Sequence, residues 1–342
     1  MPVSIKELSK YCGCSPSAVS KALNGYPDIG EETRTRVLAA AKELGYQPSA
    51  IAKGLKTGRT YNIGVLYNEM SGTGLTHGYF SPVLEAFKAE TERRGYDITF
   101  LSQSLRSGKQ QQMSYLQHSR YRNVDGVCIF CCDFYEDQVR ELVDSHLPVA
   151  TIDHPFDGHS CVASANVDGI RALTQYVIDC GHRRIAFIHG ESAQATHERL
   201  AGFLETMQIN GLSILPEYLV EAPYHNPTPT REATARLLRL PNRPTCILMP
   251  DDYAALGGMD AITAAGLSIP GDVSVTGFDG IPLMQLRKPC LTTVAQDTAS
   301  IGREAARQLI HQIERREDFE PRRITIPTRL ITGDTVAPVN NG

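Results

Sequence analysis

The sequence lacks any apolar run long enough to cross a membrane. None of its hydrophobic stretches approaches the roughly 20 residues that a bilayer-spanning helix requires. The segment from Met1 to Tyr11 also lacks the apolar core of a secretory signal. A hydrophobic content of 42% over 342 residues is nevertheless enough to fill the cores of two or three domains. We therefore expect a globular protein that stays in the cytoplasm and has no membrane partner.

A disulfide framework and the common catalytic motifs are also missing. The nine cysteines are irregularly spaced in a long chain, which favours reduced thiols. Cys128–Cys132 has no second Cys/His pair at zinc spacing, so these cysteines are expected to be small core residues, as are Cys12 and Cys14. The glycine-rich segment Gly72–Gly78 begins too far beyond the preceding strand for a dinucleotide-binding turn. Without an HExxH or GxSxG motif, we expect no enzyme activity, no metal and no cofactor.

Charge is distributed unevenly along the chain. Residues 1–60 contain nine Lys/Arg and five Asp/Glu, a net charge of +4, while the remainder carries −8. A basic N-terminal segment favours contact with phosphates through counterion release, and an acidic remainder opposes it. Any binding of nucleic acid should therefore be confined to the N-terminal segment.

The segment Ser15–Gly25 predicts a short helix with two different faces. Ser15 can cap the first turn, and Pro16 stands where its missing N–H costs nothing. Asn24 and Gly25 tolerate the left-handed backbone that ends a helix. The polar face suits a groove better than a core. The apolar face contains Val19, Ala22 and Leu23, and the polar face contains Ser17, Ser20 and Lys21.

Two further helices are predicted on either side of this one. Ser4–Glu7 is a capping box, and the helix that it begins places Ile5, Leu8 and Tyr11 inward. A turn containing Gly13 then leads into the Ser15 helix, which is the helix-turn-helix pattern. Any small three-helix domain has the same periodicity, so periodicity alone leaves DNA binding open. The third helix is expected from Glu31 to Leu44, with Val37, Leu38, Ala41 and Leu44 on its buried face and Gly45 as its stop.

Beyond Tyr61, short apolar runs alternate with amphipathic stretches. This alternation predicts parallel sheets with right-handed helical crossovers, and eight runs divide better between two lobes than within one sheet. The expected boundary between the lobes lies near Ala163 and Ser164. The predicted strands are 62–67, 98–101, 126–130, 149–152, 185–189, 219–221, 246–249 and 273–278, and the helices include 83–94, 170–180, 233–240 and 253–265.

Candidate ligand-binding residues follow the ends of these strands. Ligands of open α/β sheets bind outside the carboxyl ends of strands. Carboxylates, a guanidinium and an aromatic wall suit a polyol, because they hydrogen-bond to its hydroxyls and pack on its face. For each acid other than Asp279, a helix cap or a solvated loop end is an equally valid interpretation. The candidates are Tyr79, Phe80, Asp153, Arg199, Tyr224, Asp251, Asp252 and Asp279, with His225 beside Tyr224 as a further one.

The N-terminal region resembles the headpiece of the lactose-repressor (LacI/GalR) family of bacterial transcription regulators. The resemblance is carried in one register by Ile5–Lys10, Ser15–Gly25, Ile29–Val37 and Leu44–Pro48. It implies that Pro16, Ser17 and Lys21 read bases, Lys21 standing where many relatives carry an arginine. An ammonium cannot form the bidentate guanine contact of a guanidinium. The implied DNA-binding residues are Ser15, Pro16, Ser17, Ser20, Lys21, Asn24, Lys53, Leu55 and Lys56.

The segment Ser49–Thr60 has two interpretations. It is too short for a stable isolated helix, and Gly54 lowers helix stability by about 1 kcal/mol relative to alanine, so alone it indicates a flexible basic linker. The resemblance instead implies a hinge helix that folds on operator DNA, where a pair of such helices enters the minor groove and kinks the duplex. Leu55 matches the wedge of that family and Lys53 the adjacent basic residue.

The resemblance continues through Cys180–Ile188 and Val275–Asp279 and implies a two-lobed α/β body like a periplasmic binding protein. Arg199 and Asp279 match effector contacts of the family, whereas Asp251 departs from its usual asparagine and adds charge. The implied domains are a headpiece at 1–47, a hinge at 48–60, an N-lobe at 61–163 and 292–322, and a C-lobe at 164–291 and 323–342.

We therefore expect a homodimeric transcriptional repressor that binds operator DNA under allosteric control by a small effector, a sugar or sugar derivative. The chain ends without a leucine heptad, so we expect no tetramer-forming tail. Two alternatives remain: a regulator controlled by a partner protein, and a sugar-handling enzyme with a DNA-binding head.

Overall fold

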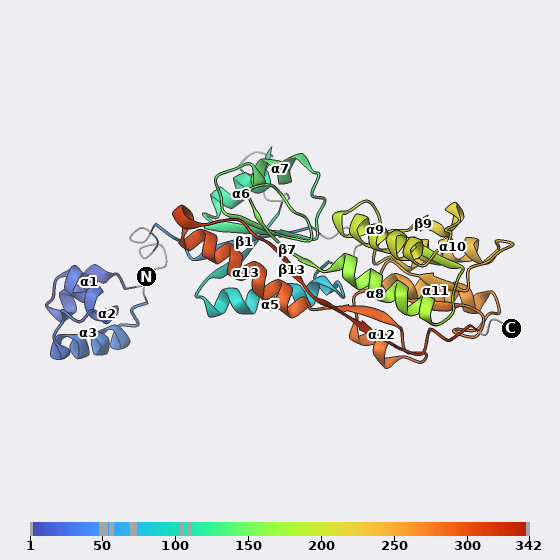
Figure 1. The fold of residues 1–342 in the computed structure, drawn as a ribbon. Helices are drawn as coiled ribbons and strands as arrows, with labels where there is room; N and C mark the ends of the chain where they lie inside the picture. Colours follow the sequence, from blue (N-terminus) through green and yellow to red (C-terminus); the bar gives the residue numbers. More distant parts are fainter. Residues whose placement is uncertain are drawn as a thin grey trace. The chain divides into compact units, whose positions relative to one another are not determined.

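The chain divides into two compact units, Met1–Tyr61 and Asn62–Gly342, and each is described by itself (Figure 1). The structure is a computed structural model, and it describes residues 3–47, 54, 58–68, 74–102, 106–107 and 111–339. No helix among these residues has both the length and the apolarity needed to cross a bilayer.

The first unit is a three-helix headpiece. Helix α1 covers Ile5–Cys12, α2 covers Pro16–Leu23 and α3 covers Glu31–Glu43. The capping box between Ser4 and Glu7 is present, and the Ser15 hydroxyl accepts from the amide of Ala18 at 3.2 Å, so both predicted helix starts are confirmed. The buried core of the headpiece consists of Leu8, Cys12, Val19, Ala22, Val37, Ala40 and Ala41.

Three details of the headpiece differ from the sequence prediction. Tyr11 is 55% exposed, and its hydroxyl donates to Glu43 at 2.9 Å instead of entering the core. Leu38 is 48% exposed, because the buried stripe of α3 runs through Val37, Ala40 and Ala41 and leaves Leu38 about 100° to one side. Asn24 was expected to share the left-handed backbone with Gly25, but its φ is −93°, and of the two residues Gly25 adopts that conformation with a φ of 70°.

The second unit begins with an N-lobe built on a six-stranded parallel sheet. Its strand order is β13-β7-β6-β5-β1-β2, and helices α5 and α13 lie side by side on one face while α6 and α7 cover the other (Figure 1). The strands are β1 (Asn62–Tyr67), β2 (Asp97–Leu101), β5 (Gly126–Phe130), β6 (Val149–Ile152), β7 (Ser160–Ser164) and β13 (Arg323–Ile326). The helices are α5 (Phe80–Arg93), α6 (Tyr115–Tyr121), α7 (Asp137–Val143) and α13 (Thr298–Glu314), with short 3₁₀ turns η1 (Gly74–Thr76) and η3 (Arg316–Asp318) and a small hairpin of β3 (Arg106–Ser107) and β4 (Gln111–Gln112).

The C-lobe is built on a four-stranded parallel sheet of order β11-β10-β8-β9. Helices α8 and α9 pack on one face and α10 and α11 on the other, each pair against its own apolar cluster. The strands are β8 (Ile185–His189), β9 (Leu219–Glu221), β10 (Cys246–Leu248) and β11 (Ser274–Thr276), beside an antiparallel pair of β12 (Thr293–Gln296) and β14 (Thr328–Ile331). The helices are α8 (Asn166–Asp179), α9 (Gln194–Ile209), α10 (Pro227–Leu238), α11 (Asp252–Ala264) and α12 (Pro282–Leu286), with η2 at Pro216–Tyr218.

Two of the predicted lobe boundaries need correction. The chain was expected to return to the N-lobe at 292 and to leave it at 323. Instead, β12 pairs with β14, and its Val294 belongs to the C-lobe core, so the return follows Gln296. Strand β13 pairs with β7 of the N-lobe sheet, so the last crossing lies between Ile326 and Thr328. Strand β7 itself was missed, because its sequence of small and polar residues gives little apolar signal.

All nine cysteines are free. Cys12 and Cys128 are buried as predicted, and burial raises the pKa of each thiol. The prediction is wrong for Cys131, which is partly exposed and has a φ of 53° directly after β5. Cys132 is also only partly buried and packs against the edge of the N-lobe core.

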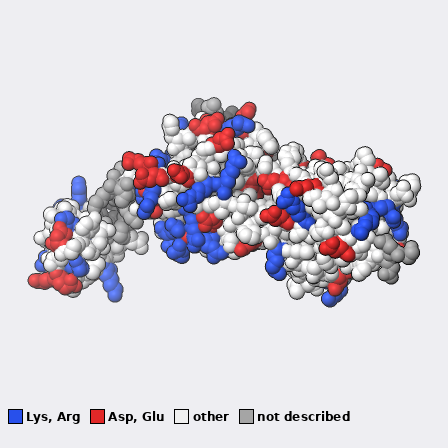
Figure 2. All heavy atoms as spheres, viewed as in Figure 1, with Lys and Arg blue, Asp and Glu red and all other residues white. Residues whose placement is uncertain are grey.

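Glu90 joins the two long helices of the N-lobe. Its carboxylate is 6% exposed and accepts from Arg93 of its own helix and from the cap residue Arg94 at 2.8 Å each, and from Arg307 of α13 at 3.1 Å. Basic side chains gather over the part of the N-lobe where α5 and α13 lie (Figure 2). Hydrogen bonds from the guanidinium groups, with that of Arg93 as the largest cause, hold the pKa of Glu90 well below its usual range.

We expect Glu90→Gln to lower the free energy of unfolding by about 1–3 kcal/mol, because three guanidinium groups lose their shared anion. Since the folded-state pKa is depressed, the stabilisation is complete above the ordinary glutamate pKa of about 4.3 and is lost as the pH falls further. Chemical unfolding at pH 6 and pH 3 checks this. Glu92→Gln, which removes an exposed partner of Lys88, is the control and should change stability by less than about 0.5 kcal/mol. Equal losses in both variants would contradict the prediction.

Candidate functional site

Arg199 is the fixed centre of a polar cluster beside the strand ends of the C-lobe. The side chain, on α9, is 6% exposed. Its Nε donates to Asn166 Oδ1 at 2.9 Å, its Nη1 donates to the Pro250 carbonyl at 3.2 Å, and its Cζ lies 3.6 Å from the ring centroid of Phe278. Two hydrogen bonds and an aromatic face hold the guanidinium in one orientation, as a binding residue requires.

Tyr79 and Asp153 present a polar group from the N-lobe. The Tyr79 hydroxyl donates to Asp153 Oδ2 at 3.3 Å. Burial raises the pKa of Asp153 to about 6, although the charge of Arg199 and the hydrogen bond from Tyr79 oppose the rise. Arg199 also influences the pKa of Tyr79, so residues from both lobes share one electrostatic environment. Asp153 has a φ of 66°, a left-handed conformation that non-glycine residues adopt at an energetic cost.

Asp279 is a buried acid with one unsatisfied oxygen. The side chain amide of Gln296 donates to its Oδ1 at 2.6 Å, whereas Oδ2 has no hydrogen-bond partner among the described residues. Burial, followed by the nearby charge of Asp251, raises the pKa of Asp279 well above the ordinary value. Its φ of 123° lies in a region used almost only by glycine. Such a strained, under-satisfied carboxyl group is typical of a functional site.

The neighbouring acids Asp251 and Asp252 have different roles. Asp251 caps α11, since its Oδ1 accepts from Ala254 N and its Oδ2 from His225 N, both at 2.8 Å. This is the helix-cap alternative that the sequence left open. Asp252 accepts from Ile281 N at 2.8 Å and from the Thr293 hydroxyl at 2.5 Å, so it braces the loop after β11. Burial raises the pKa of Asp252 to about 7 against these hydrogen bonds.

His225 and Tyr224 complete the cluster from the loop after β9. The ring of His225 lies 3.8 Å, centroid to centroid, from that of His77 in the N-lobe, so this pair connects the two lobes. The Tyr224 hydroxyl shares a 2.8 Å hydrogen bond with Thr196, and its ring lies 5.6 Å from Arg199 Cζ. Burial raises the pKa of Tyr224, which keeps the phenol protonated.

The structure brings together most of the predicted ligand-binding residues. Tyr79, Asp153, Arg199, Asp251 and Asp279 are connected by the contacts and charges above. Phe80 lies beside them but packs in an aromatic group within the N-lobe, 6.0 Å from the ring of Phe130 and 4.9 Å from that of His77. Asp252 is turned into the C-lobe instead.

The polar face of the headpiece helix α2 is accessible. Pro16 and Ser17 are exposed, while Ser20 and Lys21 are partly exposed. Lys21 forms an ion pair with Asp28, which raises the pKa of the lysine through a hydrogen bond and lowers that of the aspartate. Asn24 donates to the Ser20 carbonyl at 2.7 Å, and the Ser15 hydroxyl serves as the helix cap. The remaining predicted DNA-binding residues, Lys53, Leu55 and Lys56, lie outside the described residues.

Comparison with known proteins agrees with this division into headpiece and body. Residues 4–49 match the model described as "Bacterial regulatory proteins, lacI family", and residues 174–336 match a periplasmic binding protein-like domain. The chain is 30% identical over 341 residues to the HTH-type transcriptional repressor PurR of Vibrio vulnificus, covering 98% of this chain and 99% of that protein. It is 31% identical over 338 residues to the HTH-type transcriptional repressor PurR of Escherichia coli O139:H28, covering 97% of this chain and 96% of that protein.

The chain belongs to the LacI family. This LacI-family member is a DNA-binding transcriptional regulator with a small-molecule effector. Its fold is shared with the lac repressor dimer bound to operator and the anti-inducer ONPF, at a TM-score of 0.81 and 24% identity over 98% of this chain and 100% of that chain. The complex of the transcriptional regulator CelR with cellobiose gives a TM-score of 0.71 at 25% identity, and the match covers 97% of this chain and 99% of that chain.

Several residues of the cluster in this LacI-family chain were missed by sequence reasoning. Asn166 follows the carboxyl end of β7, so recognising that strand would have indicated it. Gln296 ends β12, which pairs with β14, a strand distant from it in the sequence. His77 and Thr196 have no local signal, because their roles depend on contacts with residues 225 and 224. The missed members are Asn166, Gln296, His77, Thr196 and Phe278.

We expect Gly190→Ala to weaken effector binding by roughly tenfold, about 1.4 kcal/mol. A Cβ at Gly190 would lie 2.0 Å from a ring carbon of Tyr224, so the ring would have to leave its place beside Arg199. Calorimetric titration with the effector measures the change, while operator affinity without effector should remain within about twofold. Tyr224→Ala removes the ring without altering Gly190 and should cause a similar loss. An unchanged effector affinity in both variants would exclude the ring from the site.

Proposed function

We propose that this LacI-family regulator is a cytoplasmic repressor, without enzyme activity, whose affinity for operator DNA is set by a sugar or sugar derivative bound between its lobes. The observation that carries the proposal is the shared environment of Asp153 and Tyr79 from the N-lobe and Arg199 and Asp279 from the C-lobe. Carboxylates accept from sugar hydroxyls, a guanidinium donates to them, and aromatic rings pack on the faces of the sugar.

The connections between the lobes support a mechanism of control. The chain passes between the sheets after Ser164, after Gln296 and after Ile326. A ligand that contacts both sides favours one relative angle of the lobes, and it can shift the equilibrium only by its difference in affinity for the two angles. A coupling of about 1–3 kcal/mol changes operator occupancy 5- to 150-fold.

The effector proposal is tested by a binding selection on random duplexes, followed by titration of the selected operator in the presence of a panel of sugars. We expect one preferred pseudo-palindromic sequence and at least one sugar that changes the operator affinity by roughly fivefold or more. Operator binding that no sugar or sugar derivative alters would overturn the effector assignment and favour control by a partner protein. Turnover of a sugar during the assay would overturn the assignment as a non-enzyme.

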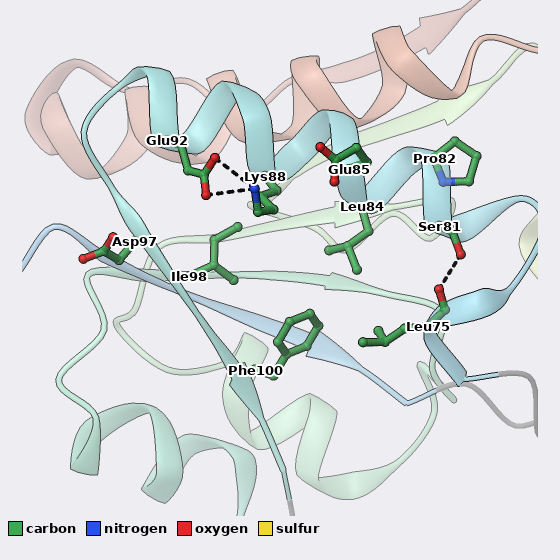
Figure 3. A pocket seen from close by; sticks show the side chains of 10 residues that line it. All are labelled: Leu75, Ser81, Pro82, Leu84, Glu85, Lys88, Glu92, Asp97, Ile98 and Phe100. Carbon is green, nitrogen blue, oxygen red and sulfur yellow. Dashed lines mark hydrogen bonds and ion pairs between the residues drawn. The ribbon is translucent and has the colours of Figure 1, made fainter.

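An apolar groove on the N-lobe supports assembly as a dimer. The groove lies between η1, α5 and β2, the edge strand of the sheet (Figure 3). Phe100 and Leu75 are 44% and 55% exposed within it, and Lys88 and Glu92 form an ion pair at its border. Exposed apolar patches of this kind mark interaction surfaces. We propose a second copy of the chain as the occupant, because the lac repressor that shares this fold is a dimer.

We expect Phe100→Asp to convert the dimer to a monomer at micromolar concentration. The substitution places a charge where the groove must be dehydrated, and an interfacial aromatic residue typically contributes about 2 kcal/mol or more. Light scattering during gel filtration measures the mass. Tyr121→Asp, which alters another exposed aromatic side chain of the N-lobe, is the control and should leave the mass unchanged. A dimer that survives Phe100→Asp would place the interface elsewhere.

A further inference from the structure

Two carboxylates and an imidazole converge on the C-lobe side of the proposed effector cleft. One ligand atom from each of His225, Asp251 and Asp279 lies within 4.8 Å of the others. Asp251 and Asp279 are buried, and His225 is partly buried. We propose that this triangle binds a divalent transition-metal ion of the zinc type. Three protein ligands leave at least one coordination position for an oxygen of a bound molecule.

The separation of His225 and Asp251 fits two ligands of one ion better than a direct hydrogen bond. Nδ1 of His225 lies 3.6 Å from Oδ1 of Asp251, which is longer than a normal N–H···O contact. Two atoms that bind a zinc ion tetrahedrally at the usual distances lie roughly 3.4 Å apart. The pair is therefore spaced for an ion between its members with little rearrangement.

Asp279 supplies a second observation that points to a ligand at the triangle. The residue is 7% exposed, and its Oδ2 has no hydrogen-bond partner in the described part of the chain. A buried carboxylate oxygen without a partner is costly unless a donor or a cation satisfies it. Arg199, whose positive charge lies nearby, donates to Asn166 and to the Pro250 carbonyl and not to this oxygen. A metal ion would satisfy the oxygen and offset the repulsion between Asp279 and Asp251.

Groups around the triangle hold its members in place, as outer residues do at metal sites. Ala254 N and His225 N fix the carboxylate of Asp251 at 2.8 Å each, and Gln296 fixes that of Asp279 at 2.6 Å. The His225 backbone adopts a φ of 53°, and its ring packs against His77. The three side chains thus point to a common place before any ion binds, which lowers the entropic cost of binding.

The test uses the full chain, freed of metal with a chelator and titrated with Co²⁺ in calorimetry and visible absorption. We expect one Co²⁺ per chain with ligand-field bands typical of nitrogen and oxygen ligands, displaced by Zn²⁺. His225→Gln and Asp279→Asn should each weaken this binding by roughly 10- to 100-fold or more. His146→Gln alters an exposed histidine and should not change it. Circular dichroism melting confirms that each variant is folded.

Failure to bind Co²⁺, or equal binding by wild type, His225→Gln and Asp279→Asn, would overturn the proposal. Absorption from thiolate-to-cobalt charge transfer that persists in both variants would also overturn it, because it would assign the ion to cysteines. The regulatory meaning of the ion rests on the proposed function, so operator binding is measured in parallel. Sugar-sensitive operator binding without Co²⁺ binding would reject only the metal site, whereas Co²⁺ binding without any operator preference would reject only the proposed function.

Discussion

Replacing Arg199 by alanine is expected to abolish the response of operator binding to the effector. The guanidinium is buried, held by Asn166 and the Pro250 carbonyl, and stacked on Phe278, so its remaining donors are fixed for a ligand. Removing one partner from a buried charged contact costs about 2–5 kcal/mol, a factor of roughly 30 to several thousand in affinity. Operator affinity without effector should change little, because the headpiece is a separate compact unit.

Fluorescence anisotropy of a labelled operator, titrated with effector, measures this loss. Arg171→Ala removes an exposed arginine of the same lobe, paired with Glu205, and should leave the dose-response curve unchanged. Arg199→Lys keeps the charge but loses the planar arrangement of donors, and we expect it to recover only part of the response. A normal dose-response curve for Arg199→Ala would remove this residue from the effector site.

Lys21→Ala is expected to weaken operator binding and to relax the choice of sequence. A side chain that reads a base typically contributes about 1–3 kcal/mol of discrimination, and a dimer loses that amount at each half-site. The ion pair with Asp28 suggests a second substitution whose expected effect on operator affinity is the opposite. Asp28→Asn frees the ammonium group and removes a negative charge from the side of the headpiece predicted to face DNA, so we expect tighter binding and a steeper dependence on salt.

Binding selections and salt titrations of the wild type, Lys21→Ala and Asp28→Asn distinguish base recognition from a general effect of charge on DNA affinity. Lys42→Ala removes an exposed lysine from the last turn of α3, and it should leave the preferred sequence unchanged. If Lys21→Ala retained both the affinity and the sequence preference of the wild type, Lys21 would not read bases.

Local signals explain why much of the fold could be predicted from the sequence. The capping residues Ser4 and Ser15 mark the starts of α1 and α2 directly, and continuous apolar runs mark buried strands such as β1 and β5. Leu38 was misplaced because a hydrophobic residue next to the buried stripe of a short helix looks like part of it. The crossings after Gln296 and Ile326 were misplaced because strand pairing between distant segments leaves no local signal.

The candidate site was predictable only as a set of strand ends. Rules for parallel sheets indicated Asp153 and Asp279, the resemblance to the family indicated Arg199 on a helix, and the structure connects the three. The same rules could not separate Asp251 from Asp252, since both follow β10, and the hydrogen bonds from Ile281 N and the Thr293 hydroxyl that turn Asp252 inward form only in the folded chain. The sequence argument predicted no metal because it searched for ligands close together in the chain, and such a search cannot detect the triangle that we propose. His225, Asp251 and Asp279 come from three different loops and meet only after folding.

The hydrogen bonds of Gln296 connect Asp279, a proposed ligand contact, directly to the segments that join the two lobes. Gln296 donates to Asp279 and accepts from the hydroxyl of Ser164, while the chain leaves the C-lobe at Gln296 and enters it after Ser164. A molecule that binds Oδ2 of Asp279 therefore contacts a carboxylate whose other oxygen is held by Gln296, beside two of the three interlobe connections. Ligand binding at Asp279 and the stiffness of the interlobe connections should then change together. The effect of the ligand therefore reaches the segments that move through one side chain, without a series of contacts through the body.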